Sequence, residues 1–283
     1  MRSSRSTDFT KSFGPVKTLQ MPEGHTIHRL AKDLNKTIRP QPVIASSPQG
    51  RFADEAAQLD GLVLNEAQAW GKHLFMDFEG APLLHIHLGL IGKLRKKEVD
   101  AEEAGAIRLR LTSDTATWDL TGPMVCALID DDDAVKVTSK LGPDPLRKDA
   151  DPDEFAARMK RKKLPLSAAL LDQKVIAGIG NVYRSEFCYL AGIDPNTPAN
   201  ELSDEQVAEL WDMAKSQLKL GIRLNRIVTR EPDEVGVTAA KMPNDERLYV
   251  YKREGQPCHR CGDEIRLSEI AKRKAWYCPT CQA

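Results

Sequence analysis

The sequence lacks the features of a membrane protein, a secreted protein or a uniformly basic nucleic-acid-binding protein. No apolar run approaches the ~20 residues that a membrane-spanning helix needs, so we expect a soluble chain with no membrane partner. The 41 basic and 41 acidic residues cancel, so any contact with nucleic acid has to come from local patches. Residues 1–20 lack the apolar core of a secretory signal and resemble a leader, a tag or an upstream start more than folded structure.

Cysteine is scarce, but its placement is informative. Four of the six cysteines form two Cys-x-x-Cys pairs separated by sixteen residues: Cys258, Cys261, Cys278 and Cys281. Four thiolates at this spacing are typical of a zinc ribbon, which predicts one structural Zn²⁺ with no coordination position left for water. Two such pairs in a chain of this length indicate metal in a reducing compartment, not a disulfide framework.

The periodicity of apolar residues divides the chain into parts of different structure. Residues 26–34 have helical spacing, and short alternating runs follow up to about residue 145, which predicts a β-sandwich or flattened barrel. The Pro- and Asp-rich segment 141–153 is interpreted as a linker. Beyond it the spacing is helical, and Ser203 with Gln206 predicts a capping box at one helix start.

Two charged or polar positions suit phosphate binding. In AGIGNVYRSE (177–186), two glycines precede a predicted helix that begins at Asn181, which is typical of an anion site, of a tight joint between helices, or of both together. Arg273 lies between the cysteine pairs, where a hairpin tip would present its guanidinium to a phosphate. Charge on an exposed hairpin is common, so Arg273 alone is a weak signal.

Three further positions have an ordinary interpretation and a functional one. Lys72 opens a predicted strand, where a lysine ordinarily faces solvent. His85 and His87 lie on one face of a strand and could bind metal, although packing is the preferred interpretation because no third ligand follows at usable spacing. In LGLIGK (88–93), Leu90 or Ile91 is either an exposed wedge or part of a buried corner.

Several segments, in order, resemble the formamidopyrimidine-DNA glycosylase and endonuclease VIII family of base-excision repair enzymes. They are MPEGHTIHR at 21–29, GK at 71–72, HLGLIG at 87–92, LLDQKVIAGIGNVYRSE at 170–186, and the ribbon ending in YCPTCQ. The resemblance extends from Met21 to Ala283. The PEGHT start and the weak arginine–phenylalanine signature place the chain nearer the endonuclease VIII branch, with its actinobacterial second form as one candidate.

The resemblance implies an α+β fold in three domains. These are a catalytic two-layer antiparallel β-sandwich with flanking helices over 21–145, a helix-two-turn-helix DNA-binding domain over 146–240 and a zinc-ribbon finger over 241–283. It also implies a bifunctional DNA glycosylase/AP lyase that excises oxidised bases, mainly pyrimidines, by β,δ-elimination. The partners implied are damaged duplex and abasic-site DNA, with single-stranded or bubble DNA also open, for a monomer in the bacterial cytoplasm at the nucleoid.

The resemblance assigns roles to six residues. After removal of the initiator methionine, Pro22 would be the nucleophile, Glu23 would assist opening of the sugar ring, and Lys72 would contact the DNA backbone beside the lesion. Asn181 and Arg273 match the phosphate clamps, and Leu90 matches the void-filling wedge.

The sequence departs from the family pattern in two places. Thr26 replaces a glutamate often found there, which bears on the proton transfers of the glycosylase step. DLTGPMVCAL (119–128) replaces the Asp-Pro-Arg-Arg-Phe-Gly stretch, so we expect a less complete wedge and no strong preference for cytosine opposite the lesion. While residues 1–20 remain attached, the nitrogen of Pro22 is a tertiary amide, so the 1–283 chain is expected to lack lyase activity. The alternatives are a non-catalytic protein that binds damaged or kinked DNA, a zinc-ribbon protein that contacts RNA or protein, and, least favoured, a histidine-based metallohydrolase.

Overall fold

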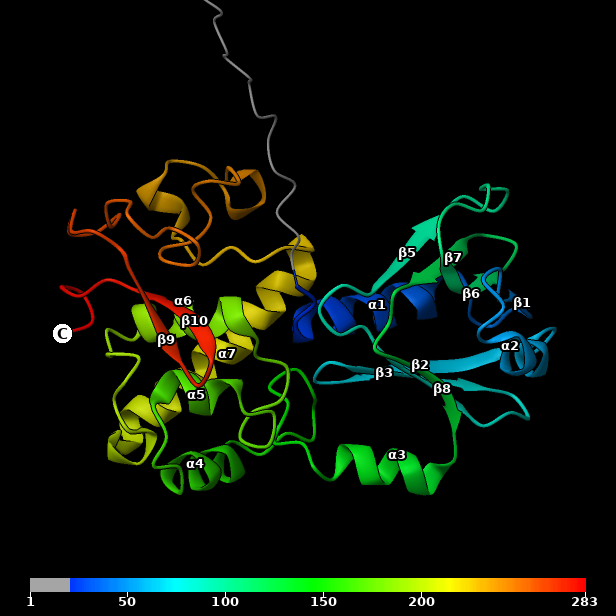
Figure 1. Ribbon diagram of the computed structural model, residues 1–283, viewed down its shortest axis with the longest axis horizontal. Helices are drawn as coiled ribbons and strands as arrows, with labels where there is room; N and C mark the ends of the chain where they lie inside the picture. The colour runs from blue at the N-terminus through cyan, green and yellow to red at the C-terminus, as the bar shows by residue number, and fades with distance from the viewer. Residues whose placement is uncertain (1–20) are drawn as a thin grey trace, which may run out of the picture.

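Two bodies of different composition lie side by side in the computed structural model, which describes residues 21–283 (Figure 1). The first contains two four-stranded antiparallel sheets with strand orders β1-β6-β7-β5 and β2-β3-β4-β8. Their strands are β1 Ile44–Ser46, β2 Leu64–Trp70, β3 His73–Phe78, β4 Leu83–His87, β5 Lys93–Lys97, β6 Ile107–Thr112, β7 Thr117–Thr121 and β8 Val125–Ile129. The predicted β-sandwich is confirmed. The prediction that residues 1–20 stand outside the fold concerns residues that lie outside those described.

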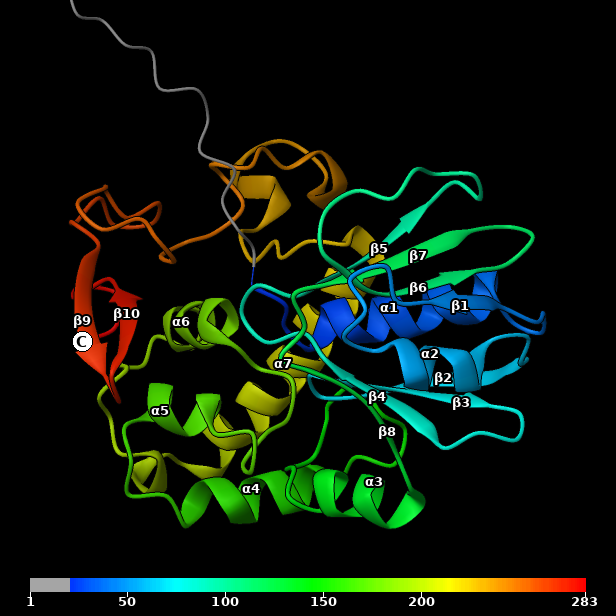
Figure 2. The same ribbon diagram turned by 45° about the vertical axis from the view of Figure 1, so that its right-hand side comes forward.

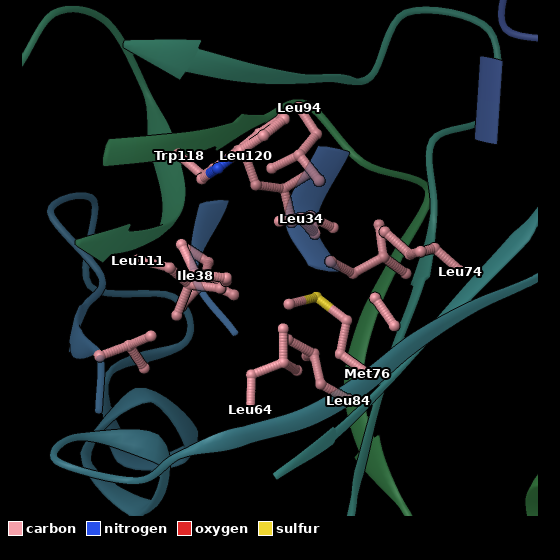
Figure 3. Close-up of a cluster of buried hydrophobic side chains, with 14 of the residues drawn as sticks. Leu34, Ile38, Leu64, Leu74, Met76, Leu84, Leu94, Leu111, Trp118 and Leu120 are labelled. Atoms are coloured by element: carbon pink, nitrogen blue, oxygen red, sulfur yellow. The ribbon is translucent and has the colours of Figure 1, made fainter. Parts of the chain in front are cut away.

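The sandwich is held together by apolar side chains from both sheets and from one helix. In β6, residues 107, 109 and 111 are buried and alternate with half-buried polar residues, as a strand with one face on the core requires. Helix α1, Gly24–Thr37, contributes Leu34, and Ile38 follows at its C-cap. Figure 3 shows both side chains between Leu94, Leu111, Trp118 and Leu120 of one sheet and Leu64, Leu74, Met76 and Leu84 of the other. Helix α2, Ala53–Leu59, buries Ala56 and Leu59 in the same core.

The second body is helical and carries a two-stranded ribbon. Its helices are α4 Pro152–Lys160, α5 Leu166–Leu171, α6 Asn181–Leu190 and α7 Asp204–Leu224, and its strands are β9 Arg266–Ile270 and β10 Arg273–Tyr277. Asp151 caps α4, and the capping box of Ser203 and Gln206 at the start of α7 is present as predicted. The ribbon lies beside α5 and α6, on the side of this body away from the sandwich strands β5 to β7 (Figure 2).

One sequence interpretation needs correction. Segment 141–153 is more than a linker, because Asp144 is 4% exposed and its carboxylate accepts hydrogen bonds from the amide of Gly71 and the ring of His28, both at 2.7 Å. The exposed acidic residues that follow Asp130 begin helix α3, Asp131–Thr138, with the Asp130 side chain as N-cap. A single helix of eight residues with no buried side chain leaves no apolar periodicity to detect.

Within residues 21–283, no helix combines the length and the apolar character needed to cross a membrane.

Candidate active site

A cleft of about 510 Å³ lies where the sandwich meets the helical body. It is lined by all six residues that the sequence singled out for catalysis or DNA contact: Pro22, Glu23, Lys72, Leu90, Asn181 and Arg273. These side chains come from the start of α1, the β2–β3 turn, the β4–β5 turn, the start of α6 and the ribbon. Segments far apart in the sequence therefore converge at one junction between the two bodies.

Glycines permit the close backbone contact that brings these segments together. The amide of Gly24 donates a 2.7 Å hydrogen bond to the carbonyl of Gly178, and a Cβ on Gly24 would lie 2.8 Å from the Gly178 Cα. Gly71 has a φ of +57°, and a Cβ there would lie 3.1 Å from the Gly178 nitrogen. A larger side chain at Gly24 would therefore displace Glu23, which precedes it directly. A larger side chain at Gly71 would displace Lys72, which follows it.

The carboxylate of Glu23 is held by the N-terminus of α6. Glu23 is 1% exposed, and its oxygens accept hydrogen bonds from the amides of Gly180 and Val182 at 2.8 Å and from that of Tyr183 at 3.5 Å. The amides of Gly180, Val182 and Tyr183 are taken by a carboxylate of the protein, which fits a tight joint between segments. The phosphate contact of Asn181 stays a prediction.

Lys72 does not face solvent as a strand-edge lysine would. Its Nζ donates a 2.6 Å hydrogen bond to the carbonyl of Ile179, in the same loop that holds Glu23. Burial lowers the pKa of Lys72, an effect that the charge of Glu23 opposes and that of Arg273 reinforces. Burial likewise raises the pKa of Glu23, against the ammonium of Lys72 and the α6 amides. Each group thus reduces the cost of burying the other.

Asn181 and Arg273 form one wall of the cleft. Arg273 is exposed and follows the ribbon turn, where Ala271 and Lys272 have positive φ values of 52° and 60°. The Asn181 amide donates to the carbonyl of Lys274 at 3.2 Å, and in the described part of the chain its buried Oδ1 has no hydrogen-bond partner. The guanidinium of Arg184, beneath them, donates to the same carbonyl at 2.8 Å. The ribbon is thereby tied to α6, and both candidate phosphate ligands are held together.

Three apolar side chains stand exposed beside the cleft. Leu90, Ile91 and Met124 are 50%, 66% and 67% exposed, so the interpretation of 88–93 as a buried corner is wrong for the loop tip. A Cβ on Gly89 would lie 2.9 Å from the Met124 Cβ, so the β7–β8 turn packs directly against the Leu90 loop. Sequence reasoning missed Met124. The available signal was its position in 119–128, the segment that stands in place of the family's phenylalanine-bearing stretch.

The strand register supplies a third histidine that the sequence spacing concealed. His73 pairs with His87 across β3 and β4, and its Nδ1 lies 2.9 Å from the Nε2 of His85. Burial lowers the pKa of His73 to about 3 and that of His85 to about 4, so both rings are neutral at physiological pH. Phe75 stacks on His85 at 4.8 Å, which supports the packing interpretation of this cluster. His87 also lines the cleft.

The four predicted metal ligands converge. Within residues 21–283, they form the one group of three or more candidate ligand residues whose atoms all lie close enough to hold an ion, within 4.8 Å of one another. The sulfurs of Cys258 and Cys281 are 3.8 Å apart, and those of Cys261 and Cys278 are 3.4 Å apart. Tetrahedral Zn–S bonds of about 2.3 Å place sulfurs about 3.8 Å apart, so the donor set fits such an ion. With four protein ligands, the metal would be structural.

Comparison with known proteins agrees with this geometry. The family described as "Formamidopyrimidine-DNA glycosylase N-terminal domain" matches residues 21–123, and the "Formamidopyrimidine-DNA glycosylase H2TH domain" matches residues 141–233. The "Zinc finger found in FPG and IleRS" matches residues 255–283.

Individual relatives span nearly the whole chain. "Endonuclease 8 1" of Mycobacterium tuberculosis is 42% identical over 267 residues, which cover 93% of this chain and 100% of that protein. "Endonuclease 8 2" of Mycobacterium bovis is 34% identical over 269 residues, with the same coverage. A solved complex between the Lactococcus lactis Fpg and an abasic site containing DNA matches with a TM-score of 0.76 and 27% identity, and covers 92% of this chain and 99% of that one.

The fold and the site therefore define a glycosylase-like chain with a helix-two-turn-helix domain and a zinc finger. The chain belongs to the formamidopyrimidine-DNA glycosylase and endonuclease VIII family. Both mycobacterial endonuclease VIII forms are similar to it, the first form more so than the second.

Proposed function

We propose that this protein is a bifunctional DNA glycosylase/AP lyase of base-excision repair in which the nitrogen of Pro22 is the nucleophile. The observation that carries the proposal is the position of Pro22 in the interdomain cleft, beside the buried pair of Glu23 and Lys72. Family membership supports it, since the relatives are named endonuclease 8 and Fpg.

The chemistry begins with a free secondary amine at Pro22. An α-amino group has a pKa near ~8, so a useful fraction is unprotonated at neutral pH. Its attack on C1′ of the sugar expels the damaged base and opens the ring to an iminium. Glu23, whose pKa is raised by burial, supplies the proton to the ring oxygen. Loss of the C2′ proton then breaks the C3′–O bond, loss of the C4′ proton breaks the C5′–O bond, and water releases Pro22.

The remaining cleft residues hold the DNA in this proposal. Arg273 and Asn181 contact phosphates on either side of the lesion, and Lys72 contacts the backbone next to the reacting sugar. Leu90 fills the space that the flipped nucleotide leaves, with Met124 packed beside it. The exposure of Ile91 and Met124 favours a fuller wedge than the missing arginine–phenylalanine stretch had suggested.

We also propose roles for the three domains, the metal, the substrate and the oligomeric state. Domains 21–145, 146–240 and 241–283 would supply catalysis, DNA binding and the phosphate-binding finger, and one Zn²⁺ per chain would order the finger. The preferred lesions are oxidised pyrimidines in duplex DNA, with single-stranded and bubble DNA as further substrates. We further propose that the protein acts as a monomer in the bacterial cytoplasm, at the nucleoid.

Borohydride trapping on DNA with one abasic site tests the proposal. A chain beginning at Pro22 should become covalently linked to the DNA, whereas the 1–283 chain should not, because its Pro22 nitrogen is acylated. The intact mass of each preparation shows whether the leader is present. Binding of abasic DNA without trapping by the chain beginning at Pro22 would favour the non-catalytic alternative. A panel of lesion oligonucleotides, duplex and single-stranded, then identifies the substrate.

A further inference from the structure

One polar side chain at the cleft is fully occupied by hydrogen bonds to its own loop. The Nε2 of Gln173 donates to the carbonyls of Leu171 and Ile179, both at 2.9 Å, and its Oε1 accepts from the amide of Gly178 at 3.0 Å. Its orientation is fixed by these neighbours, because a carbonyl can only accept and an amide N–H can only donate. Both side-chain N–H groups are used, so Gln173 has none left for DNA although it lines the cleft.

The two residues that Gln173 holds, Gly178 and Ile179, also accept hydrogen bonds from the sandwich. The carbonyl of Ile179, which accepts from Gln173, also accepts from the Nζ of Lys72 at 2.6 Å. The carbonyl of Gly178, whose amide donates to Gln173, accepts from the amide of Gly24 at 2.7 Å. The side-chain amide of Gln173 is thus hydrogen-bonded to the same two residues, Gly178 and Ile179, that two segments of the sandwich contact.

Other hydrogen bonds to this loop come from neighbouring segments: the amide of Ala177 donates to the carbonyl of Pro143, and the amide of Gly180 donates to Glu23. Gly178 has a φ of +94° and Gly180 follows two residues later, so this backbone has many alternative conformations. Helix α5 ends at Leu171, and the backbone hydrogen bonds of Val175 and Ile176 run to Asp172, before the glycines. The side chain of Gln173 is therefore the restraint from within the helical body that bonds directly to both Gly178 and Ile179, at the point where Lys72 docks.

We infer that Gln173 is a positioning residue for the reaction, which sets the location of the Lys72 ammonium relative to Pro22 without touching DNA. This inference rests on the proposed function. A displacement of about 1 Å in a reacting group can reduce a rate by about 100-fold, so loss of this restraint should affect the chemical step. Binding of DNA through Asn181 and Arg273 should be affected less, because neither side chain is hydrogen-bonded to Gln173.

Two substitutions separate the donor and acceptor roles. Gln173→Met keeps the side-chain length and loses all three hydrogen bonds. Gln173→Glu keeps the acceptor for Gly178 but, when ionised, sets a negative oxygen against the carbonyls of Leu171 and Ile179. A protonated carboxyl can donate one hydrogen bond again, so the Glu variant should recover at low pH. Gln68→Met, on an exposed side chain of β2 outside the cleft, is the matched control.

The measurements use the chain beginning at Pro22 on abasic duplex DNA. For Gln173→Met, we expect the single-turnover trapping rate at saturation to fall by about 10-fold or more, with a smaller change in Kd for a tetrahydrofuran abasic-site analogue, because the contacts of Asn181 and Arg273 are retained. For Gln173→Glu, the rate relative to the unsubstituted chain should rise as pH falls from 8 to 5.5. The control should match the unsubstituted chain at every pH.

The possible outcomes distinguish the two proposals. Equal trapping rates for Gln173→Met and the unsubstituted chain would overturn the positioning role alone. A parallel loss of DNA affinity and rate in both variants, without recovery of the Glu variant at low pH, would assign Gln173 a merely structural role and also overturn it. Absence of trapping by the unsubstituted chain would refute the proposed function, and this inference with it. If Gln173→Met does not fold, the pH profile of Gln173→Glu still decides.

Discussion

Two buried carboxylates contact or belong to helix α6, and backbone amides donate hydrogen bonds to both of them. Glu23, at the cleft, accepts hydrogen bonds from the amides of Gly180, Val182 and Tyr183. Glu186, on the side towards the zinc ribbon, is 0% exposed and accepts from the amides of residues 249, 250 and 251 and from the hydroxyl of Thr229. Only Glu23 lines the cleft and has a lysine ammonium as its main opposing charge.

The comparison shows that the number of hydrogen bonds to a buried carboxylate does not reveal its role. Glu186 fastens the segment that leads into the ribbon to α6, and its neighbours are backbone amides and a hydroxyl. Glu23 fastens the sandwich to α6 and also faces the space that a substrate would occupy. We therefore expect Glu186 to contribute to stability, whereas the proposed function gives Glu23 a role in both stability and proton transfer.

The largest expected effect is the loss of activity in Glu23→Gln. The amide is nearly isosteric but cannot deliver a proton, so base excision should fall by about 10²- to 10⁴-fold. Binding to an abasic-site analogue should change far less. Single-turnover excision and a binding titration on the chain beginning at Pro22 measure both quantities. Excision by Glu23→Gln at the unsubstituted rate would contradict the assignment of proton transfer to Glu23.

The next largest effect is the loss of stability in Glu186→Gln. The amide NH₂ would face backbone N–H groups, and each buried donor left without an acceptor costs about 1–3 kcal/mol. We expect the free energy of unfolding to fall by about 3 kcal/mol or more, with activity per folded molecule retained. Denaturant unfolding and trapping at low temperature test the two parts. If excision is lost in a fully folded Glu186→Gln protein, the contrast between the two carboxylates does not hold.

A smaller effect distinguishes the cleft from the ribbon. Truncation of both Leu90 and Met124 to alanine removes the exposed apolar side chains at the cleft, so affinity for a duplex with an abasic-site analogue should fall by about 10-fold, since unstacking costs a few kcal/mol. Affinity for single-stranded DNA should change little. Leu267→Ala is the control, because Leu267 is also exposed, at 39%, but lies on the ribbon and not in the cleft lining.

The smallest effect is a pH-dependent difference in stability. Burial raises the pKa of Glu23 above its ordinary value of 4.5, so the folded state retains a proton that the unfolded state has lost. The resulting stabilisation is present below about pH 4.5 and disappears as pH rises through the folded-state pKa. The unsubstituted chain should therefore lose stability relative to Glu23→Gln as pH rises above this range. Melting temperatures of both proteins, measured against pH, test this direction. A melting temperature of the unsubstituted chain that rises relative to that of Glu23→Gln with increasing pH would contradict the prediction.

Sequence reasoning succeeded where a signal is local. The four cysteines identify their own site because metal ligation needs fixed residue types at short spacing, and Ser203 with Gln206 identifies a helix start for the same reason. It failed where a role depends on distant neighbours. Met124 was missed because its packing against Gly89 is formed across two turns, and His73 because strand register brought it to His85.

The amino-acid sequence by itself determined the β-rich and helical parts of the chain and the metal ligands, because these follow from periodicity and from motifs of fixed spacing. Its resemblance to a known family indicated the family and six of the residues at the cleft. Only the tertiary structure decided what those residues do to one another. The desolvated contact of Lys72 with the Ile179 carbonyl, the capping of α6 by Glu23 and the restraint by Gln173 all arise where two bodies meet. Charge and hydrogen-bond strength there depend on burial, which no local stretch of sequence specifies.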